Sequence, residues 1–346
     1  MRLGFLRGER LGHFALEPEV YLCERDAGFH AGHDDVFTVR GPVCNSYLAE
    51  QWARHLTIQP GDHHRREMPW VEGADPHGLI ERTAPHLTFT DEEHQRGRAL
   101  LKQLGVNGPH VLFHARDGAY LDQALPRVRD WRYHDHRDAS IGNYLPAMAE
   151  MVRRGYSAVR YGAIVSDPLP PQACGRGIVD YSTSGRRSDF LDVYLMATCR
   201  FAVVSASGPA ALAAIFRRPV VFANVCPLLT AHKPTFPMAR LFLPKLYQDQ
   251  GRTLTVAETV ARGLDNIGEA CELGDVDVIE NTPAEIAAVA REMDDRLNGT
   301  WEPHPDDEAL QARFWDAAGM PVQRCRVGAE FLRDHPELLG GDGGDN

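Results

Sequence analysis

The sequence predicts an α/β fold with two domains, each built on a parallel sheet. Short apolar strands alternate with helices through the middle of the chain, which is typical of a parallel sheet covered by helices on both faces. The 346 residues exceed what one ordinary core holds, and 43% of them are hydrophobic, so two modest cores can be filled. We expect an N-terminal domain over 1–105, a second domain over 106–270, and a strand and helices over 271–346 that complete the second domain or pack against the first.

The N-terminal domain is expected to begin with a strand at Arg2–Leu6, then the loop RGERLG and an apolar-periodic helix over 14–23. Thr90 and Glu93 have the spacing of a capping box, and Gly105 suits the left-handed end of the helix that they start. The other expected elements of this domain are a strand at 36–39, a helix capped by Asn45 that reaches 55, and a loop over 60–85.

The second domain shows the most regular alternation. Apolar runs predict its strands, at 110–113, 158–161, 178–181, 201–204 and 220–223. Helical periodicity predicts helices at 141–154, 188–198 and 209–216. After Cys226 the pattern is irregular until a strand at 276–279. Three helices are then expected, over 283–297, 308–317 and 327–338, the first with Thr282 as its cap and Pro283 at its first position.

Composition and charge exclude several classes of function. The formal net charge of −11 argues against a nucleic-acid binder, which would present a basic face. No stretch approaches the roughly 20 apolar residues of a transmembrane helix, and the N-terminal MRLGFLRGER lacks the apolar core of a signal peptide. The seven cysteines are scattered without a CxxC pair, so we expect reduced thiols and a cytoplasmic location.

Residues that could hold a phosphate follow three of the predicted strands. In an open parallel sheet, ligands bind outside the carboxyl ends of the strands. The runs at these positions are His114–Ala115–Arg116–Asp117–Gly118, Gly162, and Ser205–Ala206–Ser207–Gly208, the last opening onto a helix. Backbone amides and the helix dipole favour an anion there, and a guanidinium binds phosphate oxygens bidentately. We therefore predict a phosphate site, although Ser-x-Ser-Gly is also an ordinary N-cap turn and Arg116 could form a surface ion pair.

Two further candidates lie in neighbouring segments. The charged run 133–138, which contains Arg137, belongs to the loop that follows the same strand as Arg116 and could fold over the ligand. A hydrated surface loop is the alternative. Asp189 stands one residue past the expected cap Ser188 and could bind a ribose hydroxyl or a sugar, but it equally suits the first turn of a helix, where the dipole favours a carboxylate.

Six runs of the sequence, spread over most of the chain, are informative as whole segments: HARDGAYL, YHDHRDASIGNYLPAMAEMVRRGYSAVRYG, DYSTSGRRSDFLDVYLMATCRFAVVSASG, RRPVVFAN, RLGHFALEPEVYL and VIENTPAEIAAV. These runs resemble a bacterial group classed as glycosyltransferases of the GT-B type, and the resemblance covers most of the chain. It implies a GT-B-like fold, with two Rossmann-like domains facing across a cleft and C-terminal helices. It also implies a nucleotide-sugar donor bound between residues 110 and 225, and a glycan or small-molecule acceptor.

More distantly, His114-x-Arg116 and FAVVSASG are similar to motifs of GT-B fucosyltransferases. In that family the arginine of an HxR motif grips the donor's β-phosphate, and a serine-bearing turn holds the diphosphate. By that resemblance the donor contacts would be Arg116, Ser205, Ser207 and Gly208. Asp117 stands where a second arginine is common, so the resemblance does not assign a GDP-linked donor.

Glycosyl transfer needs positive charge for the departing diphosphate and often a base for the acceptor hydroxyl. The resemblance places that base in the loop after the first strand of the first domain, which here ends in Gly12–His13. An imidazole with a pKa of about 6.5 suits this role, so His13 is the candidate base, with Glu9 and Glu17 as weaker candidates. The alternative is that His13 only caps or packs the following helix.

We predict no metal and no other cofactor. His30-x-x-His33 and His63–His64 do not have the helical spacing of a metal-binding pair, and no CxxC accompanies them. Asp306–Asp307–Glu308 follows prolines rather than a strand, unlike the carboxylate pair by which GT-A enzymes hold Mn²⁺. The expected reaction is therefore metal-independent.

Two other functions fit parts of the pattern. A nicotinamide-linked oxidoreductase needs GxGxxG after its first strand, and the loop 7–12 offers Gly8 and Gly12 without a third glycine in register. A non-catalytic subunit that binds a nucleotide-sugar and activates another transferase would carry the same phosphate site. Release of nucleotide without an added partner would separate an enzyme from such a subunit.

Overall fold

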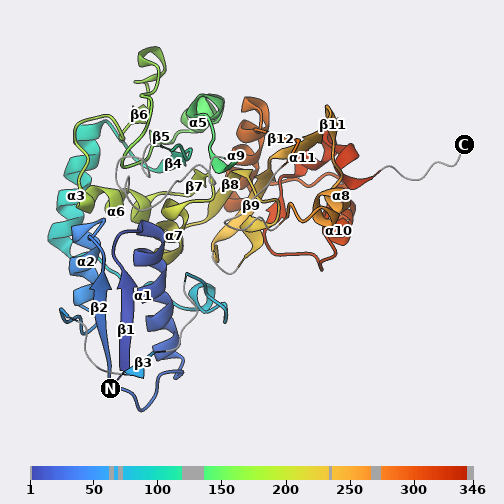
Figure 1. Cartoon of the computed structure of the whole chain (residues 1–346). Coiled ribbons are helices and arrows are strands. Elements are labelled where there is room, and N and C mark those ends of the chain that lie inside the picture. The colour runs from blue at the N-terminus through green and yellow to red at the C-terminus, as the bar shows by residue number, and fades with distance from the viewer. Residues whose placement is uncertain are drawn as a thin grey trace, which may run out of the picture.

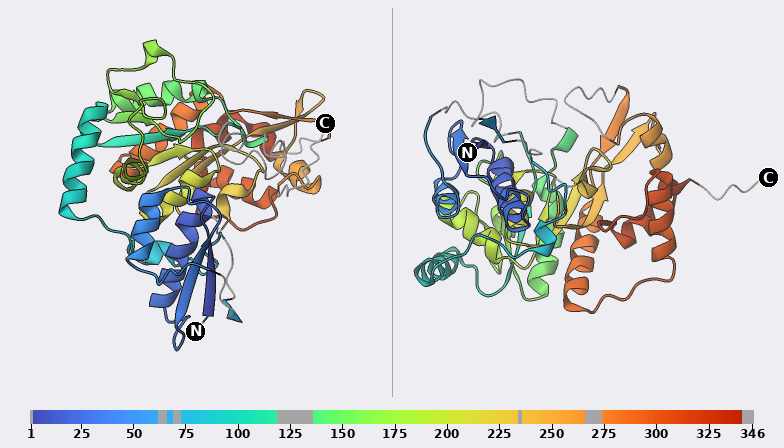
Figure 2. Two further views of the ribbon diagram at one scale, coloured as in Figure 1. Left: turned by 60° about the vertical axis from the view of Figure 1, so that its left-hand side comes forward. Right: turned by 90° about the horizontal axis from the view of Figure 1, so that it is seen from below.

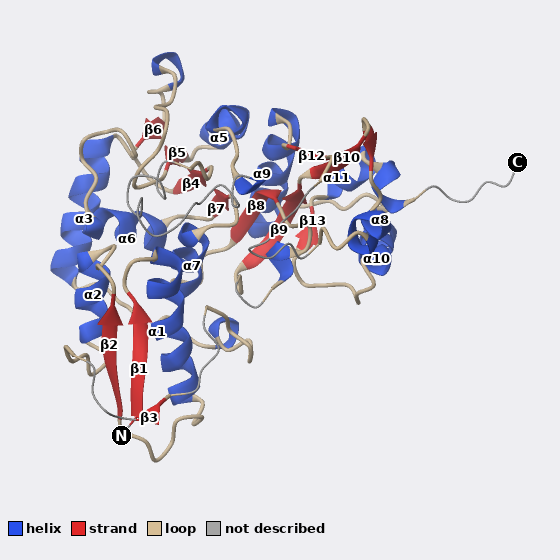
Figure 3. Cartoon of the chain, viewed as in Figure 1, coloured by secondary structure: helices blue, strands red, loops and turns tan. Residues whose placement is uncertain are grey.

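The computed structural model describes residues 2–61, 66–68, 73–118, 136–233, 236–265 and 274–340. The chain forms two α/β units, each built on a parallel sheet, and Figure 1 shows the smaller N-terminal unit below the larger one. Strands β1 (Arg2–Arg7) and β2 (Asp35–Arg40) point with their carboxyl ends toward the larger unit (Figure 3). The predicted α/β class with two Rossmann-like units is confirmed.

The N-terminal sheet has the order β2–β1–β3, with β3 at Arg66–Glu67, and both strand pairs are parallel. Its helical elements are α1 (Leu11–Asp26), α2 (Ser46–Ala53), η1 (Ile80–Arg82) and α3 (Asp91–Leu104). The predicted caps are confirmed. The Asn45 side chain accepts from the amide of Leu48 at 2.8 Å, and Thr90 and Glu93 form a capping box. Gly105 ends α3 in the left-handed conformation, with φ of 84°.

Helix α1 starts earlier than expected, because Gly12 and His13 lie in its first turn rather than in the preceding loop. Its N-cap is Arg10, whose side chain makes no capping hydrogen bond, so the sequence carries no start signal there. Pro18 inside the helix has no N–H to donate to the carbonyl of Phe14. The indole N–H of Trp52, from α2, donates to that oxygen instead at 2.8 Å.

The larger unit contains seven parallel strands in the order β13–β9–β8–β7–β4–β5–β6. Their bounds are β4 His110–His114, β5 Ser157–Arg160, β6 Ile178–Asp180, β7 Ala202–Val204, β8 Val220–Val225, β9 Ala239–Pro244 and β13 Arg326–Val327. Strands β5, β7 and β8 are buried along their whole length, as expected for parallel strands covered on both faces. Along the chain, β4 is the first strand of this sheet and β7 the fourth, so the strand order reverses between these two neighbours.

Helices cover this sheet, and their bounds are η3 Ile141–Tyr144, α5 Leu145–Arg153, η4 Pro171–Ala173, α6 Asp189–Thr198, α7 Gly208–Ile215, η5 Thr230–His232, α8 Val256–Ala261, α9 Pro283–Asn298, α10 Asp307–Ala317, α11 Ala329–Asp334 and η6 Pro336–Leu339. The prediction of a single helix over 327–338 is wrong. Its segment begins in β13, and Pro336 separates α11 from η6 because proline cannot continue the helical hydrogen bonds.

The segment that looked irregular after Cys226 contains three strands, β9, β10 (Leu246–Asp249) and β11 (Arg252–Thr253). No helix separates them, so strand–helix alternation gave no guide to their presence. The expected strand at 276–279 exists as β12 (Val276–Ile279), but it pairs antiparallel with β10 in a separate three-stranded sheet. The C-terminal residues also supply β13 to the main sheet.

Helices α1 and α7 join the two units by packing side by side, and Figure 1 shows α7 next to the start of α1. They run in the same direction, because Gly12 meets Gly208 at their starts and Glu19 meets Arg217 further along. At their N-termini, glycine meets glycine: a Cβ on Gly12 would lie 3.3 Å from the Gly208 Cα, and a Cβ on Gly208 would lie 3.1 Å from the Gly12 nitrogen. Helix α3 makes a second contact and stands along the side of the molecule (Figure 2). There a Cβ on Gly97 would lie 2.3 Å from the ring of Tyr194, on α6.

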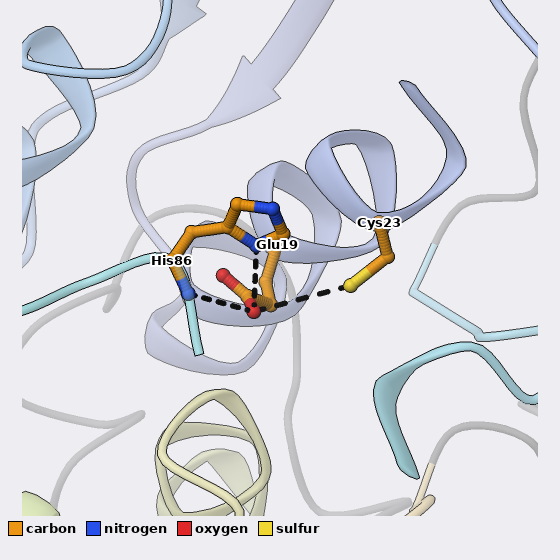
Figure 4. A group of neighbouring side chains, drawn as sticks. All are labelled: Glu19, Cys23 and His86. Carbon is orange, nitrogen blue, oxygen red and sulfur yellow. Dashed lines mark hydrogen bonds and ion pairs between the residues drawn. The ribbon is translucent and has the colours of Figure 1, made fainter. Parts of the chain in front are cut away.

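Buried charged groups connect the middle of α1 to Arg217, which follows α7. Figure 4 shows three of the side chains at this contact, Glu19, Cys23 and His86. One carboxylate oxygen of Glu19, on α1, lies 2.7 Å from the Arg217 guanidinium and 3.0 Å from His86 Nδ1. His86 Nε2 lies 3.0 Å from the carboxylate of Asp26. Burial alone would lower the pKa of His86, but hydrogen bonds to Cys23, Glu19 and Asp26 outweigh it and raise the pKa from 6.5 to about 10.

Replacing His86 by glutamine should therefore destabilise the protein in a pH-dependent way. A histidine whose pKa is raised on folding stabilises fully below its unfolded pKa, and this contribution disappears as pH rises through the folded value. We expect the difference in unfolding free energy between wild type and H86Q to be largest near pH 6 and to shrink toward pH 10, measured by urea denaturation. H33Q, at an exposed position, should follow wild type throughout. A difference for H86Q that is constant with pH would contradict this assignment.

Candidate functional site

The site lies where the strand order reverses, between β4 and β7. Loops leaving these neighbouring strands run to opposite sides of the sheet, which opens a crevice at their carboxyl ends. A cavity of about 330 Å³ occupies this position, and both units line it. The N-terminal unit contributes Arg10–His13, Leu16, Cys44, Asn45 and Gly73. The larger unit contributes His114–Asp117, Arg137, Tyr161–Ile164, Arg187, Asp192, Ala206–Pro209, Ala211 and Phe236.

Seven of the nine residues that the sequence singled out line this one cavity: His13, His114, Arg116, Arg137, Gly162, Ser207 and Gly208. They come from α1, from the segments after β4 and β5, and from the start of α7. In the larger unit, parallel strands bring these segments to one edge, because the carboxyl ends of all strands in the sheet lie together. His13 reaches the same place because α1 packs against α7. Ser205 and Asp189 are not among the lining residues.

Arg116 is 9% exposed and is held through both its backbone and its side chain. Its amide donates to Ser205 Oγ at 3.1 Å, and its carbonyl accepts from the amide of Ala139 at 2.9 Å. Its guanidinium forms an ion pair with Asp138. The nearby Lys245 ammonium donates to the Asp138 carbonyl at 2.6 Å. The guanidinium therefore enters the cavity from a fixed backbone.

Ser205 belongs to a buried network beneath the cavity. Tyr144 lies with its hydroxyl 3.4 Å from Ser205 Oγ and accepts from Asn224 Nδ2 at 3.3 Å. Asn224 and Asn281 exchange hydrogen bonds, each amide donating to the other's side-chain oxygen, at 2.6 and 2.7 Å. Burial raises the pKa of Tyr144 to about 12, so its hydroxyl keeps the proton that it can donate to Ser205. The network joins β7, β8 and the start of α9 to the backbone of Arg116.

Sequence reasoning missed this network and placed Ser205 in direct contact with the ligand. Ser205 is fully buried, and its oxygen accepts from the Arg116 amide, so its position supports the arginine from below. Asn224 has a φ of 58° at the end of β8, a conformation that asparagine tolerates better than most residues. The asparagine that follows the apolar run 220–223 was the one feature of the sequence that could have indicated this network.

Helix α7 opens directly onto the cavity. Its N-cap is Ser207, whose hydroxyl donates to the Ser205 carbonyl at 3.0 Å and makes no capping bond to the helix. Helix α1 likewise starts at Arg10 without a side-chain cap. Because Gly12 and Gly208 let the two helices approach, two positive dipole ends meet at the same cavity. Such a place favours an anion.

His114 and Gly162 form the wall beside Arg116. The Nδ1 of His114 lies 2.9 Å from the carbonyl of Tyr161, which can only accept, so Nδ1 carries the proton. Burial lowers the pKa of His114 below its ordinary value, so the ring is neutral at pH 7. Gly162 is needed for space, since a Cβ there would lie 2.9 Å from Val165 Cγ1 and 3.2 Å from Ser182 Oγ.

His13 faces the cavity from the first turn of α1. Its Nδ1 lies 2.8 Å from a carboxylate oxygen of Glu17, one helical turn later, and the Glu17 side chain is 1% exposed. Arg7 approaches the same oxygen at 3.7 Å. This carboxylate orients the ring with the Nδ1 proton directed inward, which leaves Nε2 as the acceptor. The histidine is thus paired with a side chain rather than with backbone.

Two other sequence candidates occupy different positions. The carboxylate of Asp189 accepts from the amide and the hydroxyl of Ser46, each at 2.7 Å, and so joins the start of α2 to the start of α6. These hydrogen bonds make Asp189 a structural link between the two units, and its expected contact with a ribose or sugar remains a prediction. Of the charged run 133–138, residues 133–135 lie outside the described residues, and Arg137 lines the cavity.

Within the ranges that the structure describes, one group of three potential metal ligands lies together: Glu19, Cys23 and His86 (Figure 4). The Arg217 guanidinium lies 2.7 Å from the Glu19 oxygen and supplies the positive charge that a cation would bring. These side chains form an interdomain contact, and metal independence of the reaction remains a prediction. Among the described helices, none has the length and apolarity to cross a membrane.

Replacing Ser205 by alanine should cost about 1–3 kcal/mol of unfolding free energy, because the buried amide of Arg116 loses its acceptor. The matched control is S182A in the same unit, where the buried hydroxyl has no hydrogen-bond partner among the described residues. We expect urea denaturation to show S182A within about 0.5 kcal/mol of wild type. Equal effects of the two substitutions would contradict the supporting role of Ser205.

No protein-family model matches the sequence, and no curated protein matches it. Among solved structures, the chain is similar to the ADP-heptose LPS heptosyltransferase II of E. coli, with 14% identity and a TM-score of 0.48 over 86% of this chain and 99% of that one. It is also similar to the E. coli heptosyltransferase WaaC with ADP, at 13% identity and a TM-score of 0.30 over 65% and 88% of the two chains. A glycosyl transferase family 9 protein of Veillonella parvula DSM 2008 gives 13% identity and a TM-score of 0.34 over 66% and 67%. Values this low carry no functional conclusion for this chain, and similarity to fucosyltransferases is not shown.

Proposed function

We propose that this protein is a glycosyltransferase that moves a sugar from a nucleotide-diphosphate sugar to a hydroxyl of a glycan or small-molecule acceptor, without a metal. One observation carries the proposal: a single cavity at the reversal of strand order contains both an anion-binding set and a histidine–carboxylate pair. The two sets come from different units and face the same space. That is the arrangement needed to bring a base to a bound donor.

The donor's diphosphate would occupy the space beside Arg116 and the starts of α7 and α1. As the bond between sugar and phosphate breaks, negative charge grows on the departing diphosphate. A guanidinium and helix amides fixed beforehand stabilise that charge without having to reorganise. The buried network under Arg116 supplies this fixity, since it holds the backbone from which the side chain extends.

The acceptor would be activated by His13. Its Nε2 takes the proton of the acceptor hydroxyl while that oxygen bonds to the anomeric carbon, and the bond from this carbon to the donor's phosphate oxygen breaks. The diphosphate leaves with the electron pair and its charge. Glu17, 2.8 Å from Nδ1, stabilises the imidazolium that forms.

The His13–Glu17 pair favours an enzyme over a non-catalytic binding subunit, because phosphate binding alone has no use for an oriented base. The oxidoreductase alternative gains nothing from the structure. Gly12 serves the close contact with Gly208, and the segment after β4 presents Arg116 rather than a glycine-rich turn.

Replacing Arg116 by alanine should weaken binding of free nucleoside diphosphates about 10- to 100-fold, the usual range for a charge-assisted hydrogen bond. Calorimetry with UDP, GDP, ADP and dTDP measures this directly, and circular dichroism checks the fold. R153A is the matched control, since Arg153 is exposed on α5 and pairs with Glu150. Unchanged affinity in R116A would remove this residue from the phosphate site.

Replacing His13 by alanine should lower turnover about 10²- to 10⁴-fold, the usual contribution of a positioned base, with donor affinity nearly unchanged. E17Q should lower turnover less, because the ring keeps a hydrogen-bond partner but loses the compensating charge. The measurement is nucleotide release from a panel of nucleotide-sugars, in the presence of EDTA throughout. Activity that requires Mn²⁺ or Mg²⁺ would refute metal independence, and full turnover in H13A would refute the base.

A further inference from the structure

A second guanidinium, that of Arg187, lines the cavity at a different wall. Arg187 lies between β6 and α6, and its side chain is 32% exposed. Here the segment after β2 meets α6: Asn45 Nδ2 donates to the Asp189 carbonyl at 3.0 Å, and Cys44 and Asn45 line the cavity too. Arg187 therefore belongs to the side of the cavity that adjoins the N-terminal unit.

Buried groups hold Arg187 in place. Its Nη2 lies 2.8 Å from Asp192 Oδ2, and the other oxygen of Asp192 accepts from the Tyr181 hydroxyl at 2.6 Å. The Tyr181 oxygen accepts in turn from the amide of Ser188, at 3.2 Å. Asp192 is 5% exposed and Tyr181 is fully buried. Burial raises the pKa of Asp192 to about 6, against the opposing charge of Arg187, so the carboxylate is ionised at pH 7.

The position of Arg187 sets it apart from the diphosphate site. In the sheet, β6 is two strands away from β4. Neighbouring strands lie about 4.8 Å apart, so the two loops are anchored roughly 10 Å from each other. Arg116 follows β4 and pairs with Asp138, whereas Arg187 precedes α6 and pairs with Asp192. One guanidinium therefore remains for a group other than the diphosphate.

The charge of the cavity also points to more than one anionic group. Its lining contains four arginines (Arg10, Arg116, Arg137 and Arg187) against two aspartates, in a chain whose formal net charge is −11. Of the two aspartates, Asp192 is bound to Arg187, and Asp117 accepts from the amide of Ser166 at 3.0 Å. Asp138, which pairs with Arg116, adds a third carboxylate, so four guanidinium groups stand against three carboxylates. A cavity in which arginine is in excess, inside an acidic protein, favours an anionic ligand.

We propose that Arg187 binds a second anionic group, a carboxylate or phosphate on the acceptor or on the transferred sugar, and that Asp192 is its positioning residue. The inference rests on the proposed function, because it assigns a substrate class to the same cavity. A guanidinium fixed by a buried carboxylate presents its remaining N–H groups in a defined plane, which suits the two oxygens of a carboxylate or phosphate.

The experiment compares probes that differ by one charged group. In the first arm, glucuronate and glucose 6-phosphate are each compared with glucose in the presence of saturating nucleoside diphosphate. In the second arm, UDP-glucuronate is compared with UDP-glucose. Affinities are measured by calorimetry for wild type, R187A, R187K and the adjacent exposed control R186A. The double variant R187A/D192N removes both charges, so that no carboxylate is left buried without its cation.

We expect wild type and R186A to prefer the charged probe in one of the two arms about 10- to 100-fold, and that arm identifies which sugar carries the anion. R187A and R187A/D192N should lose this preference, and R187K should keep part of it, since lysine supplies charge without the planar fork. Affinity for free nucleoside diphosphate should stay unchanged in all of these variants. Absence of any preference in wild type, or its persistence in R187A, would overturn the proposal. Failure of wild type to bind any nucleoside diphosphate would instead overturn the proposed function.

Discussion

The contact between Gly12 and Gly208 determines how the two units meet. A Cβ at either position would lie 3.1–3.3 Å from backbone of the other helix, so glycine at both positions lets α1 and α7 approach this closely. This approach brings His13, one residue after Gly12, to the cavity that Arg116 and Ser207 line from the other unit. Glu19, in the middle of α1, and Arg217, just after α7, form a second contact between the same two segments. The candidate site therefore depends on an interface rather than on either sheet alone.

The sequence predicted the elements whose signals are local. Asn45, Thr90 and Thr282 cap their helices as expected, because a cap depends only on the residues of one turn. The carboxyl-end rule also brought His114, Arg116, Gly162 and the 207–208 turn to one edge of the sheet, since parallel strands determine that edge whatever the loops do. Strands β9 to β11 were missed because no helix alternates with them.

What the sequence could not show were contacts between distant segments. Nothing near Ser205 says that its oxygen accepts from Arg116, and nothing near Asp189 says that its carboxylate binds Ser46, 143 positions away. The Arg187–Asp192 pair is a local contact over five positions, but it follows no motif either, because it forms only when the loop before α6 folds back onto that helix. Such contacts form only in the packed fold, so the spacing of residues along the sequence does not predict them.

The parallel packing of α1 and α7 also has an electrostatic cost. Two helix dipoles that lie side by side in one direction repel each other, and here the positive N-terminal ends of α1 and α7 meet at Gly12 and Gly208. At the C-terminal end of α7, the Arg217 guanidinium donates to the carbonyls of Ala214 and Ile215, at 3.3 and 2.9 Å, and so offsets the negative charge there. At the N-terminal end, an anion in the cavity would do the same. Ligand binding and domain apposition are then thermodynamically linked: the anion that the two units bind together also relieves the repulsion between them, so its binding free energy contributes to holding them together.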